Sequence, residues 1–176
     1  INLGLFYGMG KGKLMSQLGV NLEDATEMLA NYNERVPFVK QLMNDTMSKA
    51  GKKGFLSTIE GRRCRFEEWE PINEWGKKSL PLKEAQQEYG EHMIKRAWTY
   101  KALNRLIQGS AADQTKKAML ELYKQGYMAH IQVHDELDVS VSDNADRIKE
   151  IMEHAVSLEV PNKVDYECGP NWGNIK

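Results

Sequence analysis

Apolar and polar residues alternate most clearly between Met128 and Val141, a pattern that predicts an antiparallel hairpin. Two runs rich in β-branched residues flank the polar triplet His134-Asp135-Glu136, which is short enough to form the turn. After the triplet, apolar residues occupy every second position: Leu137, Val139 and Val141. A period of two is typical of a strand with one buried face. The hairpin should therefore carry neighbouring carboxylates at its tip.

Helical patterns with capping residues dominate the amino-terminal part of the chain. Asn21 is predicted to cap a helix that extends to about Val36, with acidic residues in its first half. Pro37 can open a second helix as its first residue, and Gly51 is expected to close it. Residues 1–8 are expected to end an earlier helix, which stops at a glycine loop containing two lysines, Lys11 and Lys13.

The middle of the chain predicts a hairpin, an irregular segment and a long helical region. Residues 54–66 are expected to form a small hairpin that turns at Glu60-Gly61. Residues 67–82 show no clear period, which indicates an irregular loop or insertion. Residues 82–125 are expected to be helical, with a break near Gly90.

The carboxyl-terminal part returns to a mixed pattern of helix and strand. Asp143 is expected to cap a helix, and the alternation in Lys163–Cys168 predicts a last strand. Helices packed on a small antiparallel sheet make an α+β fold. The sequence therefore predicts that class for the chain.

One flank of the long helix combines amides with small residues. The members of this stripe lie at helical spacing: Asn104, Gln108, Ala111 and Thr115. The neighbouring stripe is apolar and should face the core: Leu103, Leu106 and Ile107. Amides can bond to base edges, and small residues allow a close approach. The same amides could instead cap a neighbouring loop, and the pattern alone leaves both interpretations open.

The distribution of charge along the chain is more informative than the net charge. The 176 residues carry a net charge of −1, but residues 1–65 hold ten basic and six acidic groups, whereas residues 131–176 hold four and ten. Arg62, Arg63 and Arg65 crowd one strand of the small hairpin. Arginine geometry suits phosphate, so this strand is either a phosphate contact or a solvated edge. Basic surface beside an acidic pocket suits a phosphate-rich ligand near a metal ion.

The carboxylates at the predicted hairpin tip have two interpretations. Asp135 and Glu136 repel each other unless protons or a cation offset their charge, and Mg²⁺ prefers such oxygen ligands. Aspartate is also ordinary turn chemistry, so a solvated turn is the simpler interpretation of the hairpin by itself. Elsewhere, Cys64 and Cys168 lack metal-ligand spacing and form no disulfide framework, which fits a reducing compartment. No signal peptide and no apolar run long enough to cross a membrane is found.

Four blocks, taken together and in order, resemble the family A DNA polymerases, the DNA polymerase I group. The blocks are Asn2-x-Gly4-x-x-Tyr7-Gly8, Asn104-x-x-x-Gln108-Gly109-Ser110-Ala111-Ala112-Asp113, Val133-His134-Asp135-Glu136 and Gly169-Pro170-Asn171-Trp172. They resemble the second half of the fingers helix, the long palm helix, the second carboxylate motif and the usual carboxyl end. The palm helix is most similar to those of phage replicative enzymes. The resemblance implies a partial fingers subdomain over residues 1–90 and part of the palm over residues 91–176.

The resemblance also implies roles for particular residues. Asp135 would bind the two catalytic Mg²⁺ ions, Glu136 would be a nearby metal-binding carboxylate, and His134 would lie by the primer terminus. The DNA contacts would come from Asn104 and Gln108 at the minor groove, Tyr7 and Gly8 by the templating base, and Arg62 and Arg63 at the phosphates. Leu3 and Tyr7 would lie by the incoming nucleotide. Primer-template DNA, dNTPs and a missing amino-terminal portion of the polymerase are the implied partners, in the cytoplasm of a bacterial host if the source is a phage.

Departures from the family pattern shape the functional hypothesis. Leu3 stands where the family usually has an aromatic residue that contacts the sugar, and Tyr100 stands where many members have an arginine. The first carboxylate motif is absent, so we expect a fragment that is inactive without its amino-terminal part. The leading hypothesis is thus the carboxyl-terminal part of a DNA-directed DNA polymerase that transfers nucleotides by a two-metal mechanism. The alternative is a non-catalytic nucleic-acid-binding module derived from a polymerase palm.

Overall fold

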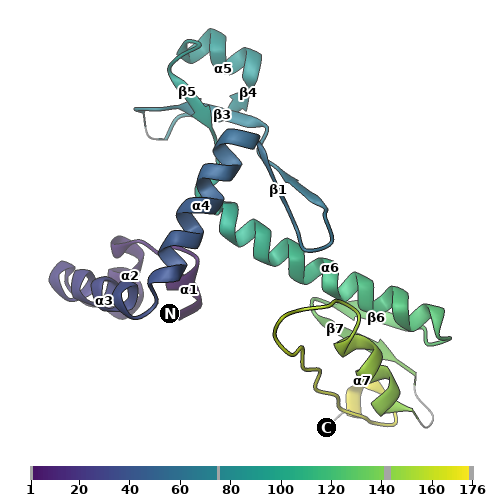
Figure 1. The fold of residues 1–176 in the computed structure, drawn as a ribbon. Helices are drawn as coiled ribbons and strands as arrows, with labels where there is room; N and C mark the ends of the chain where they lie inside the picture. The colour runs from purple at the N-terminus through teal and green to yellow at the C-terminus, as the bar shows by residue number, and fades with distance from the viewer. Residues whose placement is uncertain (1, 75, 141–143, 175–176) are drawn as a thin grey trace. The chain divides into compact units, whose positions relative to one another are not determined.

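The computed structural model describes residues 2–74, 76–140 and 144–174 (Figure 1). The chain divides into two compact units. Unit 1 spans Ile1–Gln108 and unit 2 spans Gly109–Lys176, so the division falls inside one helix, α6 (Ala102–Lys124). Helices and small antiparallel sheets occur in both units, which confirms the α+β class. The assignment of residues 1–90 to fingers and 91–176 to palm stays a prediction.

Unit 1 begins with four helices: α1 (Asn2–Phe6), α2 (Lys11–Leu18), α3 (Leu22–Arg35) and α4 (Pro37–Lys53). Asn21 caps α3 as predicted, because its Oδ1 accepts a hydrogen bond of 2.9 Å from the backbone N–H of Asp24. The predicted glycine loop is shorter than expected, since α2 already begins at Lys11. The prediction that Gly51 closes α4 is wrong: the helix continues to Lys53, and Gly54 caps it with a φ of 77°, in the left-handed region.

The hairpin after α4 is present as predicted, and a small sheet follows it. Strands β1 (Phe55–Ser57) and β2 (Arg63–Arg65) pair antiparallel, with Phe55 opposite Arg65. The irregular segment predicted for residues 67–82 instead contains two strands, β3 (Glu68–Pro71) and β4 (Leu80–Pro81). They pair through β3 with β5 (Ile94–Arg96), beside the helix α5 (Leu82–Tyr89). The strands are too short to show a period of two, which is why the pattern predicted none.

The long helix is shorter at its beginning than the sequence predicts. Helix α5 ends before Gly90, as expected, but strand β5 and the 3₁₀ turn η1 (Thr99–Lys101) separate it from α6. The core of this region joins α4, the hairpin and α6, and its buried members are Ala50, Leu56, Phe66 and Ala102. Met47 and Leu106 pack against them. The core therefore fixes the first turns of α6 beside the arginine-bearing hairpin.

Unit 2 packs a hairpin and one helix around the second half of α6. Its elements are β6 (Ala129–Val133), β7 (Glu136–Val139), α7 (Ala145–Glu153) and the 3₁₀ turn η2 (Trp172–Asn174). Leu122, Ile148 and Ile151 are buried, and Leu137 and Val139 of β7 pack against them as their alternation predicts. Strand β6 differs, because both of its faces are open to solvent and Ile131 and Val133 are 42% and 45% exposed.

In the carboxyl-terminal part, the structure contradicts one prediction and leaves two predicted residues undescribed. The strand predicted for Lys163–Cys168 is wrong: the segment is extended along unit 2 but pairs with no strand in the part of the chain that the structure describes. Side chains hold it to α7: the carboxylate of Glu153 accepts from the backbone N–H of Val164 at 3.0 Å, and Asp146 Oδ1 accepts from the Tyr166 hydroxyl at 3.3 Å. The predicted cap, Asp143, and the last apolar position of the hairpin, Val141, lie outside the described residues.

None of the described helices is both long enough and apolar enough to cross a lipid bilayer.

Candidate functional site

The tip of the β6–β7 hairpin is tighter than the sequence predicts. Val133 pairs with Glu136, so the loop contains only His134 and Asp135, and Glu136 is the first residue of β7. His134 has a φ of 57°, whereas Asp135 has no positive φ. A positive φ at the first loop residue alone is the pattern of a type II′ turn, in which glycine is usual. The conformation is thus unfavourable for histidine, and it directs the polar residues to the end of the hairpin.

The side chains at the tip are solvent-accessible and contact each other. His134 Nδ1 lies 3.2 Å from Asp135 Oδ1, and these side chains are 81% and 82% exposed. The backbone of the turn is held by Gln132, whose Nε2 donates to the carbonyl oxygen of His134 at 3.0 Å. The structure therefore places all three residues of the predicted triplet at one accessible end of unit 2.

The chemistry of this tip fits a hard divalent ion in part. Asp135 and Glu136 are adjacent and exposed, and their oxygens are of the type that Mg²⁺ prefers. Within residues 2–74, 76–140 and 144–174, however, no group of three or more His, Cys, Asp or Glu side chains is arranged to hold a metal. The tip can therefore supply two carboxylate ligands, and the remaining ligands must be water, substrate or other protein residues.

The amide stripe on α6 is exposed in unit 1, as predicted. Asn104 and Gln108 both face solvent, whereas Ala102 and Leu103 are buried at 0% and 3% exposure. Further along the helix Ala111 is exposed and Thr115 is half-buried, with its hydroxyl donating to the carbonyl oxygen of Ala111 at 3.3 Å. The two amides therefore have free access to a ligand.

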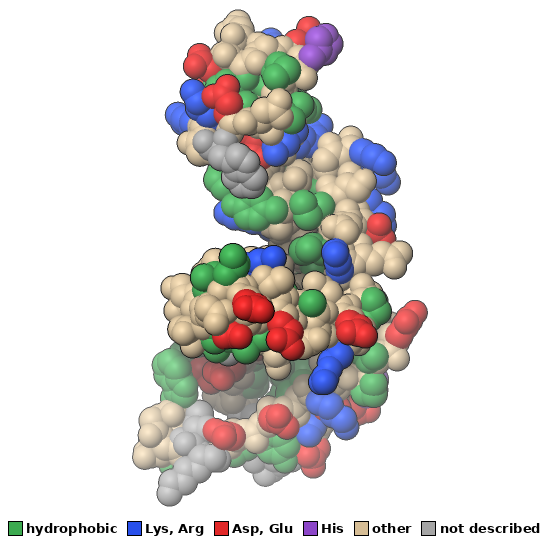
Figure 2. All heavy atoms as spheres, turned by 90° about the vertical axis from the view of Figure 1, so that its left-hand side faces the viewer, with side chains coloured by type: hydrophobic (Ala, Val, Ile, Leu, Met, Phe, Trp, Pro, Cys, Tyr) green, Lys and Arg blue, Asp and Glu red, His purple; other side chains and the backbone are tan. Residues whose placement is uncertain are grey.

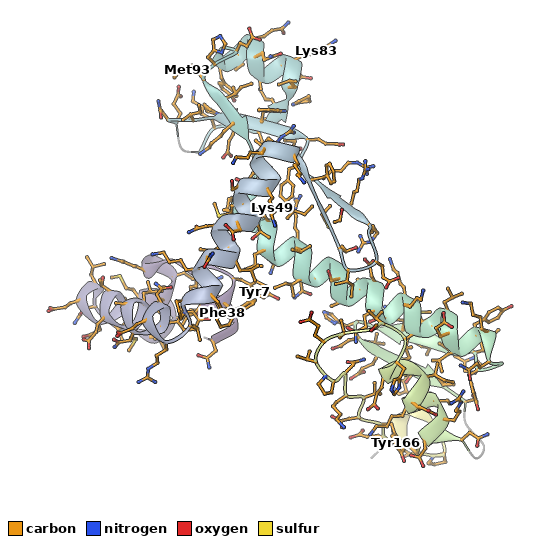
Figure 3. All side chains as sticks on the ribbon, in the orientation of Figure 1. Tyr7, Phe38, Lys49, Lys83, Met93 and Tyr166 are labelled. Atoms are coloured by element: carbon orange, nitrogen blue, oxygen red, sulfur yellow. The ribbon has the colours of Figure 1, made fainter. Side chains whose placement is uncertain are left out.

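One contact joins two residues that the sequence predicted separately. Gln108 Nε2 donates a hydrogen bond of 3.2 Å to the hydroxyl oxygen of Tyr7, which directly follows α1. Tyr7 is labelled in Figure 3. Tyr7 also meets the ring of Phe6 edge-on, with 5.4 Å between ring centroids. Gly8 follows with a φ of 83°, which favours glycine, and a Cβ there would lie 2.7 Å from Met43 Sδ, so the Met43 side chain would have to shift for a larger residue. No spacing in the sequence indicated this contact, because 101 positions separate its partners.

The arginine hairpin presents Arg62 and Arg63 to solvent. Thr58 closes the loop: its N–H donates to the carbonyl oxygen of Arg62 at 2.9 Å, and its hydroxyl accepts from the N–H of Arg62 at 3.0 Å. The guanidinium of Arg63 lies 4.7 Å from the centroid of the Phe55 ring, which orients it along the strand pair. The hairpin can therefore offer two exposed cations to an anion, and the Phe55 ring orients one of them, Arg63.

Arg105, which the sequence analysis did not select, ties this hairpin to α6. Its Nη1 donates to the carbonyl oxygen of Arg65 at 3.3 Å, and its guanidinium lies 5.1 Å from the Phe66 ring centroid. The thiol of Cys64 donates to the carbonyl oxygen of Arg105 at 3.8 Å. Since Asn104 directly precedes Arg105, these contacts keep the arginine strand next to the amide stripe. A single arginine beside an apolar stripe gives no signal of such a role in sequence.

Cations continue from this region along α4. Lys49, Lys52 and Lys53 are exposed in its last turns, and Lys49 is marked in Figure 3. The opposite charge gathers on α3, where Glu23 and Asp24 lie in the first turn, and acidic side chains cross the helices nearest the viewer in Figure 2. Unit 1 thus separates a basic surface, around the hairpin and the end of α4, from an acidic one.

A polar network fixes the chain just before α6. Glu68 accepts hydrogen bonds from the Ser79 hydroxyl and from Trp98 Nε1, the latter at 3.0 Å. These two hydrogen bonds, with smaller contributions from Arg105 and Lys78, hold the pKa of the Glu68 carboxyl below its ordinary value. Trp98 has a φ of 60°, in the left-handed region that bulky residues rarely adopt. The network therefore stabilises an unfavourable backbone conformation at the entry to the amide-bearing helix.

The structure describes no side chain for Leu3, so its predicted contact with a nucleotide lies outside the described part of the chain.

Comparison with known proteins gives concordant matches over most or all of the chain. The family model described as DNA polymerase family A matches residues 1–174. The DNA-directed DNA polymerase of Pseudomonas phage M6 is 34% identical over 210 aligned residues, which cover 99% of this chain and 28% of that protein. DNA polymerase I of Geobacillus stearothermophilus is 33% identical over 187 residues, which cover 100% of this chain and 19% of that protein.

A solved structure supports the same match in three dimensions. The POL domain of Pol1 from M. smegmatis, in complex with a DNA primer-template and dNTP, superposes with a TM-score of 0.68 at 29% sequence identity. The match covers 91% of this chain and 27% of that one. The chain therefore spans only about a fifth to somewhat over a quarter of the length of the proteins it matches.

Proposed function

This chain belongs to DNA polymerase family A, and from that premise we propose that it forms part of a DNA-directed DNA polymerase acting on primer-template DNA and dNTPs. The observation that supports this most directly is the exposed Gln108–Tyr7 pair, because two residues implied to lie at the nascent base pair are in contact although 101 positions separate them. Unit 1 would contribute DNA contacts, and unit 2 would contribute carboxylates.

Asp135 and Glu136 are the residues that would hold Mg²⁺. When bound, two such ions stabilise the attacking and leaving oxygens of phosphoryl transfer. Asp135 supplies its carboxylate from a two-residue turn with almost complete solvent access, so it can bind a ligand without repacking of the hairpin. His134, in contact with Asp135 Oδ1, restricts the rotamer of that carboxylate and lies where a primer terminus would approach.

Asn104 and Gln108 would contact the minor groove of the newest base pairs. Adenine and thymine present only acceptors there, and a guanine–cytosine pair adds one donor, so an amide can test the shape of a pair without reading its sequence. The Tyr7 hydroxyl accepts one N–H of Gln108, which orients the carboxamide and leaves its second N–H and its oxygen for DNA.

Arg62 and Arg63 would contact phosphates of the duplex. Their strand is joined to α6 through Arg105, so cations and amides are presented from connected elements of unit 1. Guanidinium groups bind phosphate in a bidentate manner, and such contacts determine the register of a protein on DNA rather than its sequence preference.

The 176 residues by themselves should not extend a primer. Two adjacent carboxylates are a partial ligand set, and the described residues hold no larger group of metal-binding side chains. The same observation favours a second candidate, a nucleic-acid-binding module that has lost catalysis. Both candidates bind DNA, so binding alone does not distinguish them.

Complementation distinguishes these two functions. The purified chain is mixed with the portion of a phage relative that lies outside the match, and extension of a labelled primer is measured with Mg²⁺ and dNTPs. Extension by the mixture, and by neither part alone, supports the polymerase. DNA binding without any extension supports the binding module. Extension by the chain alone would overturn the proposal that this chain holds only part of the metal-ligand set.

A further inference from the structure

We propose that Trp98, Tyr100 and Lys101 form a stacking site for an unpaired nucleotide of a single DNA strand, one helical turn before the amide stripe. The proposal rests on the proposed function and deepens it. Tyr100 is 54% exposed although it is a large aromatic residue, and its ring centroid lies 6.2 Å from that of Trp98. An open aromatic face at the start of a DNA-contacting helix has a chemistry that suits a base.

A cation already lies against both rings. Lys101 Nζ is 4.4 Å from the centroid of the Trp98 ring and 5.5 Å from that of the Tyr100 ring. Lys101 is itself exposed, so its ammonium retains donors for a phosphate oxygen. An aromatic surface with an adjacent cation matches the two parts of a nucleotide, the base and its phosphate.

The site is rigid on the side of Trp98. The indole Nε1 donates to Glu68 at 3.0 Å and to the Ser79 hydroxyl at 3.2 Å, and these bonds hold a backbone conformation that tryptophan disfavours. Glu68 lies at the N–H edge of the indole, and its charge is offset by hydrogen bonds and by nearby Arg105 and Lys78. A base that stacks on Tyr100 would therefore meet an ordered surface, which lowers the entropy cost of binding.

The neighbouring residues of α6 connect this site to the proposed duplex contacts. Lys101 ends η1, and Arg105 and Gln108 follow in α6 at i+4 and i+7, the spacing of one helix stripe; all three side chains are exposed. At a rise of about 1.5 Å per residue, eight residues from Gln108 to Tyr100 span roughly 12 Å, the length of three to four base steps. A duplex end on the amides would thus place its unpaired continuation within reach of Tyr100, with Lys101 and Arg105 beside the backbone.

Fluorescence anisotropy tests this site with labelled oligonucleotides and the 176-residue chain. Three DNAs share one duplex and differ in their ends: blunt, with a 5′ overhang, and with a 3′ overhang. One stacked base adds a factor of roughly 5 to 140 in affinity, which corresponds to 1–3 kcal/mol at 1.4 kcal/mol per tenfold. We expect that gain for one overhang over the blunt duplex, and the polarity of that overhang identifies the strand.

The variants separate stacking from general binding. Tyr100→Ala should abolish the gain without changing affinity for the blunt duplex, whereas Tyr100→Phe, which keeps the ring, should retain it. Tyr123→Ala is the control, because Tyr123 is a similarly exposed tyrosine (65%) that lies near the far end of α6, and its loss should have no effect. Equal affinity of the wild-type chain for all three DNAs, or an unchanged gain in Tyr100→Ala, overturns the stacking site. Failure to bind any of the three DNAs contradicts instead the proposed function.

Discussion

At the scale of single residues, substitution at the exposed hairpin tip should have the largest effect on catalysis. Asp135 is in contact with His134 but is otherwise open, so its substitution should not disturb the packing of unit 2. In the complemented enzyme, Asp135→Ala should lower primer extension by about 10²- to 10³-fold or more, the cost of removing one group that stabilises transition-state charge. Duplex affinity should remain near wild type.

Primer-extension rates and anisotropy measure these two effects side by side. Asp138→Ala serves as the control, since this residue lies three positions after Asp135, inside β7 and away from the turn. A comparable loss in Asp138→Ala, or unfolding of Asp135→Ala by circular dichroism, would show that Asp135 is structural.

The Gln108–Tyr7 hydrogen bond predicts an effect on extension from particular primer ends. Gln108→Ala should slow extension from a freshly paired end by roughly 2- to 12-fold, the value of one neutral hydrogen bond. Tyr7→Phe keeps the ring but removes the acceptor for Gln108 Nε2, so it should give a smaller loss of the same kind. Single-turnover extension of matched and mismatched ends measures both, and a uniform loss of DNA affinity would argue against the minor-groove role.

At the scale of elements, the junction between α4 and the first hairpin depends on a glycine. Gly54 has a φ of 77°, and a Cβ there would lie 2.6 Å from the guanidinium carbon of Arg96. Arg96 is held by a hydrogen bond to the carbonyl oxygen of Phe66 and lies 4.6 Å from the Trp69 ring centroid. Gly54→Ala should therefore cost about 1–2 kcal/mol for the backbone and about 1 kcal/mol more for displaced Arg96 contacts.

Gly61 provides the matched control for that prediction. Its φ of 80° is nearly the same, but nothing lies within 4 Å of an added Cβ. Gly61→Ala should thus show the backbone cost alone in urea unfolding. Equal destabilisation of the two variants would show that Arg96 moves aside without loss.

The Glu68 network should make the stability of unit 1 depend on pH in the acidic range. Because the folded-state pKa of Glu68 lies below the ordinary value of 4.5, the carboxylate stabilises the fold above that pH, and the contribution disappears as pH falls through the lowered pKa. The melting temperature of the wild-type chain should thus fall more steeply on acidification below about pH 4.5 than that of Glu68→Gln. Glu67→Gln is the control, and an identical pH dependence of all three proteins would contradict the prediction.

Which elements the sequence could predict depended on length and on local chemistry. The α3 cap at Asn21, the start of α4 at Pro37 and the alternating strand β7 carry their signals within a few residues, and all three are confirmed. The sheet of β3, β4 and β5 has strands of two to four residues, too short for a periodic signal. In Lys163–Cys168 a clear alternation formed no strand, because pairing also requires a partner edge.

The exposure of the candidate site residues was predictable from the sequence, but their contacts were not, and their roles stay predictions. The amides, the tip carboxylates and the hairpin arginines are exposed as their patterns indicated. The contacts Gln108–Tyr7 and Arg105–Arg65 span 101 and 40 positions, so no local pattern encodes them. The left-handed turn residue His134 was also unexpected, because glycine is the usual signal for that backbone conformation.

At the scale of the whole molecule, DNA affinity should depend on local rather than net charge. The net charge of −1 gives no overall attraction for a polyanion, so the hairpin cations must provide it locally. Each phosphate contact contributes about −0.9 to the slope of log K against log salt concentration. Arg62→Ala should therefore make that slope less steep by about one unit in titrations with a blunt duplex.

Arg35→Ala is a suitable comparison, since Arg35 is equally cationic and lies exposed at the end of α3. Its slope should equal that of the wild-type chain. If Arg62→Ala also leaves the slope unchanged, the hairpin is a solvated edge and the phosphate contacts lie elsewhere.

Strand β6 has a further consequence for how the protein behaves in concentrated solution. Its two faces are solvated, Ile131 and Val133 remain 42% and 45% exposed, and its outer edge pairs with no described residue. Such a strand can template the addition of an extended segment from another molecule, which is the first step of ordered aggregation. Storage at high protein concentration should therefore favour aggregation through this strand. Ile131→Lys should lower the turbidity of such a solution.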